Sequence, residues 1–143
     1  MSAPAVLYVE DEDNDVLFMQ MAWKRAGLGF PLHIARNGSE AIDYLAGNAT
    51  FSDREQHPLP SLVILDLNLP MISGLEVLEW IRQQQTPLQQ LPVVILTSSD
   101  QTRDIEQGEK LGADEFITKP SAPEDLMQVV QRLADLWLKP ARR

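Results

Sequence analysis

The chain has no cysteine, which excludes disulfide bridges and metal sites built on thiolates. It also has no apolar run near the ~18 residues that a membrane-spanning helix needs. The amino-terminal segment lacks both a basic stretch and a long apolar stretch, so we expect no signal peptide. These features are compatible with a cytoplasmic location, which is our expectation.

Positive charge is scarce as well, because 12 lysine and arginine residues stand against 21 aspartate and glutamate residues, for a formal net charge of -9. A protein that binds DNA or a membrane surface usually presents a basic patch, so we expect neither partner. The glycine-rich motifs G-x-x-x-x-G-K-[ST] and G-x-G-x-x-G are missing, which argues against a nucleotide-binding loop.

The sequence does contain a regular alternation of short apolar runs and longer amphipathic segments. Its 143 residues suit one domain spanning residues 1–143. The short runs are apolar throughout, which is typical of strands buried on both faces of a parallel sheet. Alternation repeated along the chain predicts a doubly wound α/β fold. We expect strands at 6–9, 32–35, 62–65, 93–96 and 115–118, and helices near 13–27, 39–46, 74–84, 101–111 and 123–138.

Three local features carry further expectations. Asp13 or Asn14 can cap the first helix, and the connection 47–61 is long and polar. We expect that connection to be a surface excursion, with either no role or a role in partner contact. One stripe of the first helix is expected to face the core, namely Phe18, Met19, Ala22, Trp23 and Ala26.

Polar residues gather where the expected strands end. Glu10 and Asp11 follow the first strand, Asp66 follows the third, Thr97 the fourth and Lys119 the fifth. Adjacent strands lie roughly 5 Å apart, so these side chains can converge at one edge of the sheet. Three crowded carboxylates repel one another, and a hard divalent cation with oxygen ligands, Mg²⁺, relieves that repulsion.

This set of residues suits phosphoryl transfer to a carboxylate. Mg²⁺ neutralises the oxygens of an incoming phosphoryl group, and carboxylates are known covalent acceptors of phosphate. Lys119 adds a positive charge and Thr97 adds a hydroxyl donor. Taken singly, each residue has a plainer explanation, such as a helix cap, a solvated loop end or a surface charge. Their ordered occurrence at the strand ends favours the chemical interpretation, with Asp66 as the acceptor.

These residues carry a resemblance to the receiver domain of two-component response regulators, from about residue 5 to residue 138. The segments LYVEDED, NGSEA, LVILDLNLPMISG, VVILTSS and GADEFITKP resemble motifs of that family in the same order. The resemblance implies a flavodoxin-like fold with five helices and strand order 2-1-3-4-5. It also implies a stand-alone signalling protein rather than an enzyme, with only slow self-dephosphorylation.

The resemblance implies a role for each matching acidic residue. Asp66 would accept a phosphoryl group from a phosphohistidine on a sensor histidine kinase. Asp66 and Asp11 would bind Mg²⁺ through their side chains, and Asn68 through its backbone carbonyl. Glu10 would act on the metal mostly through water, at a position where the family often has Asp.

Four further residues are implied to transmit the signal. Thr97 and Lys119 would contact the phosphoryl oxygens and bias a surface near the fourth helix and the fifth strand. Phe116 stands where the family has an aromatic switch residue, often Tyr, and is either that switch or a plain core aromatic. The Lys119–Pro120 peptide bond is expected to be cis, which would aim Lys119 inward.

The end of the chain suggests partners. The last expected helix ends near Leu138, so we expect no DNA-binding domain and an output through another protein. Leu136, Trp137 and Leu138 are consecutive, and one helical stripe cannot bury all three. We expect either a homodimer through this end or a Trp lying over the last turn. The long connection, the DLNLP segment and this ending resemble response regulators of bacterial phytochromes, which implies a phytochrome-type kinase.

The alternative function is a phosphohydrolase with an aspartate nucleophile. Such enzymes, of the haloacid dehalogenase type, need a second acid two residues after the nucleophile to protonate the leaving group. Asn68 occupies that position, which disfavours this function. Asn68 and Ser99 flank the expected path of a hydrolytic water, and neither side chain obviously blocks it.

Overall fold

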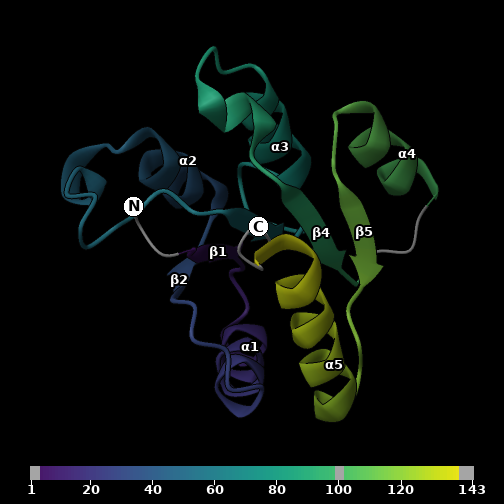
Figure 1. Ribbon diagram of the computed structural model, residues 1–143. Helices are drawn as coiled ribbons and strands as arrows, with labels where there is room; N and C mark the ends of the chain where they lie inside the picture. The colour runs from purple at the N-terminus through teal and green to yellow at the C-terminus, as the bar shows by residue number, and fades with distance from the viewer. Residues whose placement is uncertain (1–3, 99–101, 139–143) are drawn as a thin grey trace, which may run out of the picture.

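A five-stranded parallel sheet forms the centre of the computed structural model, which describes residues 4–98 and 102–138 (Figure 1). The strand order is β2-β1-β3-β4-β5, as the family resemblance implies. The strands are β1 (Val6–Val9), β2 (Leu32–Ala35), β3 (Leu62–Leu65), β4 (Val93–Thr97) and β5 (Glu115–Thr118). The helices between them are α1 (Asp13–Arg25), α2 (Gly38–Ala46), α3 (Gly74–Arg82), α4 (Thr102–Lys110) and α5 (Pro123–Leu133). The predicted doubly wound fold is confirmed. Two predictions lie outside the described residues, namely the start of the fourth helix at residue 101 and the place of Ser99 beside a water path.

The sheet separates two apolar cores because successive side chains of each strand point to opposite faces. In β1, Leu7 and Val9 pack with α2 and α3, whereas Val6 and Tyr8 pack with α1 and α5. Figure 1 shows the same division, with α1 and α5 on one side of the sheet and α2, α3 and α4 on the other. All residues of β1 and β3 are buried, which explains why their sequences are apolar without alternation.

The start and the buried stripe of α1 differ from the expectation in two ways. Glu12 is the N-cap and its side chain accepts a hydrogen bond from the Asn14 backbone N–H, so neither Asp13 nor Asn14 caps the helix. Met19 is buried, but Phe18 is 47% exposed. Each helical residue turns about 100° from the last, so Phe18 points away from the stripe that its neighbour Met19 buries.

The long connection between α2 and β3 packs against the domain. It contains a 3-10 turn, η1 (Ala49–Phe51), and the Arg54 guanidinium donates hydrogen bonds to the carbonyls of Tyr44 (2.8 Å) and Leu45 (2.9 Å) at the end of α2. The Tyr44 hydroxyl in turn donates to the Pro58 carbonyl at 2.9 Å. The excursion therefore caps α2 and covers the Tyr44 ring; a role in partner contact stays a prediction.

The last helix begins with Pro123 at its first turn and continues past α5 as a π-helical segment, η3 (Ala134–Leu138). Leu138 is buried while Leu136 is 59% exposed, which confirms that one stripe does not bury all three consecutive residues. The Trp137 indole N–H lies 3.4 Å from a Glu115 carboxylate oxygen, so the ring leans on the start of β5. Among the described residues, no helix is long and apolar enough to cross a membrane.

Candidate functional site: an acidic pocket at the carboxyl ends of the strands

Strand register brings the predicted site residues to one level of the sheet. Val9 of β1 pairs with Leu65 of β3, so Glu10 and Asp66 both stand one residue beyond that pair. The Lys119 backbone N–H donates to the Thr97 carbonyl at 2.8 Å, which places Lys119 just past the end of β4. The parallel topology thus gathers at one edge residues that lie far apart in the sequence.

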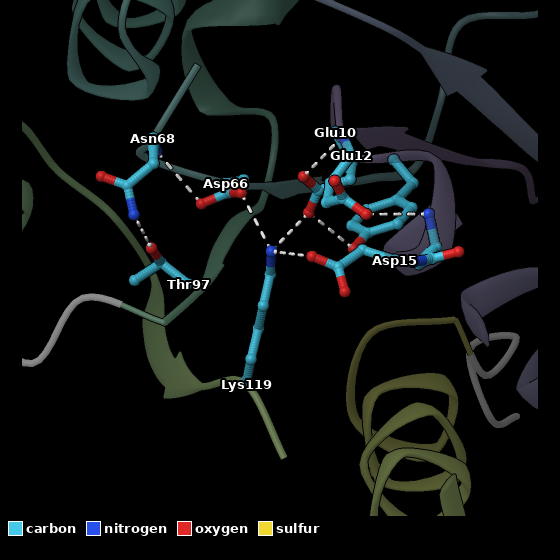
Figure 2. Close-up of polar contacts among 9 residues, drawn as sticks. Glu10, Glu12, Asp15, Asp66, Asn68, Thr97 and Lys119 are labelled. Carbon is cyan, nitrogen blue, oxygen red and sulfur yellow. Dashed lines mark hydrogen bonds and ion pairs between the residues drawn. The ribbon is translucent and has the colours of Figure 1, made fainter. Parts of the chain in front are cut away.

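A pocket of about 210 Å³ opens at this edge. We call it the acidic pocket, and it is lined by Glu10, Asp11, Glu12, Asp15, Asp66, Asn68, Ser98 and Lys119. Figure 2 shows Lys119 reaching from the end of β5 into the middle of these carboxylates. Every predicted site residue except Thr97, Phe116 and Pro120 lines it.

The Lys119 ammonium is the centre of the charge network. Its Nζ lies 2.6 Å from Glu10 Oε1, 3.0 Å from Asp66 Oδ2 and 2.7 Å from Asp15 Oδ2 (Figure 2). Burial lowers the pKa of Lys119, but the hydrogen bonds and negative charges of these carboxylates outweigh it and raise the pKa above its usual range. Lys119 is therefore a fixed cation at the acidic pocket.

Asp66 is buried yet ionised. Burial raises its pKa, but hydrogen bonds from the Asn68 backbone N–H, Lys119 and Thr97, with the Lys119 charge, bring the pKa below its usual value. The Asn68 N–H lies 3.1 Å from Asp66 Oδ1, while Lys119 contacts Oδ2. A sheltered carboxylate kept in its charged form can act as a nucleophile.

For Glu10, burial outweighs the interactions that favour the charged carboxylate. Burial is the main cause that raises its pKa to about 7, with the negative charge of Asp66 adding to it and Lys119 opposing it. The Tyr8 hydroxyl donates a hydrogen bond to Glu10 Oε1 at 3.1 Å. Burial raises the pKa of Tyr8 above its usual range, so this hydroxyl stays a donor.

The donor set fits a hard divalent cation. One carboxylate oxygen each from Glu10, Asp11 and Asp66 lies within 4.8 Å of the others, and Asp11 is exposed to incoming ions. Oxygen ligands at this spacing suit Mg²⁺ or Mn²⁺. The Asn68 side-chain amide nitrogen donates to the Thr97 hydroxyl at 3.3 Å, and the expected use of its backbone carbonyl by a metal stays a prediction.

The predicted cis bond before Pro120 is wrong, and the predicted switching role of Phe116 is not tested by the structure. The described backbone has no cis peptide bond, so the Lys119–Pro120 bond is trans. Ion pairs with carboxylates already draw the Lys119 side chain inward, so a cis bond is not needed to aim it. The Phe116 ring is partly buried and lies against Gly108 of α4, a packing compatible with a core aromatic; its switching role stays a prediction.

Sequence reasoning did not select Glu12 and Ser98, which line the acidic pocket, and it missed two residues that shape the site. Asp15, the third residue of α1, contacts Lys119, but the acidic run from Glu10 to Asp15 gives no signal of which carboxylate turns inward. Gly74 begins α3, where a Cβ atom would lie 2.2 Å from the Asp66 carbonyl oxygen. The close approach of α3 to the β3 end could have been suspected only from a glycine at a helix start.

Comparison with known proteins agrees with the site. The family model of the response regulator receiver domain matches residues 6–131. Response regulator Rcp1 of Synechocystis is 34% identical over 134 residues, which cover 94% of this chain and 88% of Rcp1. A solved Mn²⁺-bound form of Rcp1 gives a TM-score of 0.83 at 33% identity, covering 97% of each chain.

Two further solved structures are similar over nearly the whole chain. The phosphorylated cyanobacterial phytochrome response regulator RcpA gives a TM-score of 0.87 at 30% identity and covers 99% of this chain and 98% of its own. RPA3017, a response regulator in red light signalling of R. palustris, gives a TM-score of 0.89 at 30% identity and covers 97% of this chain and 96% of its own. The chain belongs to the response regulator receiver family. Within that family, it is similar in sequence and structure to Rcp1, to the phytochrome response regulator RcpA and to RPA3017 of red light signalling.

Proposed function

We propose that this response regulator accepts a phosphoryl group on Asp66 from the phosphohistidine of a sensor histidine kinase. The observation that carries the proposal is the state of the Asp66 side chain, which is buried, ionised and 3.0 Å from the Lys119 ammonium. One Asp66 oxygen forms a bond to phosphorus as the phosphorus–nitrogen bond breaks, and the electron pair of that bond returns to the imidazole. Lys119 balances the charge on the transferred group.

A divalent cation, Mg²⁺ in our proposal, completes the acidic pocket. Glu10, Asp11 and Asp66 would hold it with the backbone carbonyl of Asn68, and the Mn²⁺-bound form of Rcp1 supports a metal in this family. When bound, the ion neutralises the phosphoryl oxygens and the clustered carboxylates. The chain's own residues orient the nucleophile and supply the fixed positive charge.

The response to phosphorylation is proposed to begin with Thr97 and Lys119. Both side chains would turn toward the new phosphoryl oxygens. Because these contacts exist only in the phosphorylated form, they would shift the equilibrium between the two conformations of the domain. Phe116 lies on β5, where it pairs with Ile95 of β4, and its ring packs against Gly108 of α4, so we propose its ring as the relay. The protein acts as a switch whose aspartyl phosphate hydrolyses slowly, without the second acid that a phosphohydrolase requires.

The kinase partner is proposed to be of the phytochrome type, because RcpA and RPA3017 are described with phytochrome or red light signalling. The exchange would take place in the cytoplasm, where ATP charges such kinases. A homodimer through the exposed Leu136 end of the last helix is proposed as the form that signals.

Replacement of the acceptor tests the assignment directly. Asp66→Asn keeps the size of the side chain but removes the nucleophilic carboxylate, so we expect no Mg²⁺-dependent phosphate incorporation from a kinase or a small phosphodonor. Intact-mass measurement would report one added phosphate on the wild type and none on the variant. Asp13→Asn is the control, because Asp13 is an exposed carboxylate that pairs with Arg36 outside the pocket. Normal labelling of the Asp66→Asn protein would refute the proposal.

A further inference from the structure

The ammonium of Lys119 has no hydrogen left to offer. A lysine side chain carries three N–H donors, and Nζ contacts three carboxylates, those of Glu10 (2.6 Å), Asp15 (2.7 Å) and Asp66 (3.0 Å). Capture of a phosphoryl oxygen therefore requires Lys119 to release one of these partners. Which partner is released affects how readily the phosphorylated form is reached.

Asp15 differs from the other two partners in origin and position. It comes from the first turn of α1 rather than from a strand end, and it is outside the group of oxygens that could hold a metal among the described residues. In Figure 2, Asp15 and Thr97 lie on opposite sides of the Lys119 ammonium. Asp15 thus pulls the ammonium away from the side where Thr97 offers its hydroxyl.

The Asp15–Lys119 ion pair also forms a wall of the acidic pocket. Both side chains line the acidic pocket, and both line a second cavity of about 40 Å³ that reaches inward to Tyr8, Leu96 and Leu126. The side chains of Lys119 and Asp15 are 16% and 33% exposed. Water screens a pair in this position less than it screens a pair on the open surface.

We propose that Asp15 is a positioning residue that holds Lys119 toward α1 and thereby opposes capture of the phosphoryl group. The inference rests on the proposed phosphoacceptor function of Asp66. Glu10 and Asp66 become occupied when a cation and a phosphoryl group enter, whereas the Asp15 carboxylate keeps competing for Lys119. Asp15 therefore sets part of the balance between the unphosphorylated and phosphorylated forms.

The test measures binding of beryllofluoride, a phosphoryl analogue, in the presence of Mg²⁺ by calorimetry. Asp15→Asn keeps the shape of the side chain and removes its charge, so one donor of Lys119 becomes easier to release. We expect affinity to rise about three- to fivefold, the range of a partly exposed ion pair. Asp13→Asn makes the same charge change in the same helical turn, where Asp13 is 87% exposed, and is expected to leave affinity unchanged.

Three more variants separate positioning from a general loss of negative charge or of structure. In a Lys119→Ala background, Asp15→Asn should no longer change beryllofluoride affinity, because the effect passes through the ammonium. Asp15→Glu, which restores the charge, should return affinity toward the wild-type value. Asp15→Ala, which also removes the charge, should raise affinity as Asp15→Asn does and keeps the proposal testable if Asp15→Asn folds poorly.

The outcomes are distinct. Equal affinities for wild type, Asp15→Asn and Asp13→Asn would overturn the inference and leave the proposed function intact. An Asp15→Asn effect that persists without Lys119 would overturn it as well. A wild-type protein that neither binds beryllofluoride nor takes up phosphate would overturn the proposed function, and the inference with it.

Discussion

At the scale of single residues, the acidic pocket depends on different charge states of neighbouring carboxyl groups. Asp66 has a pKa below its usual value because hydrogen bonds and the Lys119 charge outweigh its burial, whereas burial dominates for Glu10 and raises its pKa to about 7. Both side chains contact Lys119. The difference comes from the Asn68 N–H and the Thr97 hydroxyl, which favour the charged form of Asp66.

A second residue-scale feature is the backbone of Met71 in the loop after β3. Its φ is +65°, in the left-handed region that costs an L-residue with a bulky side chain roughly 1 kcal/mol, and its side chain is 91% exposed. Met71→Asn should relieve this cost, because Asn tolerates left-handed backbone. We expect the free energy of unfolding to rise by about 0.5–1 kcal/mol in urea denaturation.

The control for the Met71→Asn substitution is Leu59→Asn. Leu59 is an exposed apolar residue, 51% accessible, and is not among the described non-glycine residues with positive φ. This change should leave stability within about 0.5 kcal/mol of the wild type. An equal gain from both variants would mean that surface polarity, and not backbone strain, is the cause.

At the scale of elements, α3 docks on the loop that carries Asp66. The helix begins with a capping box in which Ser73 and Glu76 exchange hydrogen bonds, and Gly74 lies directly against the Asp66 backbone. A Cβ on Gly74 would lie 2.7 Å from the Leu67 Cα as well as against the Asp66 carbonyl. The absence of a side chain is what lets the helix and the loop approach so closely.

Gly74→Ala should therefore destabilise the protein by at least about 3 kcal/mol, because the new methyl group meets backbone that cannot rotate away. Thermal or urea unfolding would measure this loss. Gly29→Ala is the matched control, since a Cβ at Gly29 meets nothing within 4 Å and its φ is not in the left-handed region. A Gly74→Ala protein as stable as the Gly29→Ala protein would contradict the packing described.

A cluster of rings joins β2, α2 and the connection that follows. The Tyr44 ring lies 5.8 Å from the rings of His33 and His57 and 5.2 Å from Phe51, measured between centroids. Burial, and secondly the charge of His57, lower the pKa of His33 below its ordinary value of 6.5. The Arg54 guanidinium adds another positive charge near this cluster.

This shift predicts how stability depends on pH. Below about pH 6.5 the unfolded chain binds a proton at His33 more readily than the folded protein does, so acidification favours unfolding. The contribution of His33 is fully present above pH 6.5 and is lost as pH falls through its folded pKa. His33→Gln should show a smaller drop in the free energy of unfolding between pH 7.5 and 5.5 than the wild type. Parallel curves for the two proteins would contradict the assignment.

At the scale of the whole molecule, β5 links the acidic pocket to the last helix. Lys119 follows one end of β5, and Glu115 at the other end forms an ion pair with Arg132 and accepts from the Trp137 indole. Leu136 is exposed beside this contact. A change at the pocket thus has a direct structural route to the surface proposed for dimerisation.

Leu136→Glu should weaken the proposed homodimer, because it puts a charge into an apolar interface. Sedimentation at high micromolar concentration, with and without beryllofluoride, would show a smaller dimer fraction than the wild type. Leu59→Glu makes the same change on another exposed residue outside the last helix and should leave the dimer fraction unaltered. A wild type that stays monomeric under both conditions would rule out the dimer.

The fold and most of the residues that line the acidic pocket could be predicted from the amino-acid sequence. Continuous apolar runs mark buried parallel strands because a strand covered on both faces has no polar side, and four of the five expected strands are followed directly by a predicted site residue. The residues Glu10, Asp11, Asp66 and Lys119 could be selected this way, because in a parallel sheet all strands end at one edge. The prediction that Phe18 faces the core was wrong, because a run of adjacent apolar residues does not define the direction of each side chain.

The contacts between individual groups could not be predicted from the sequence, because they depend on how the elements pack. Asp15 is one of several acids at the start of α1, and its inward direction depends on how that helix packs against α5 and β2. The need for a bare Cα at Gly74 likewise appears only when α3 packs against the backbone of Asp66 and Leu67. Local patterns specify elements through periodicity, whereas partners, burial and pKa values arise only when those elements pack together.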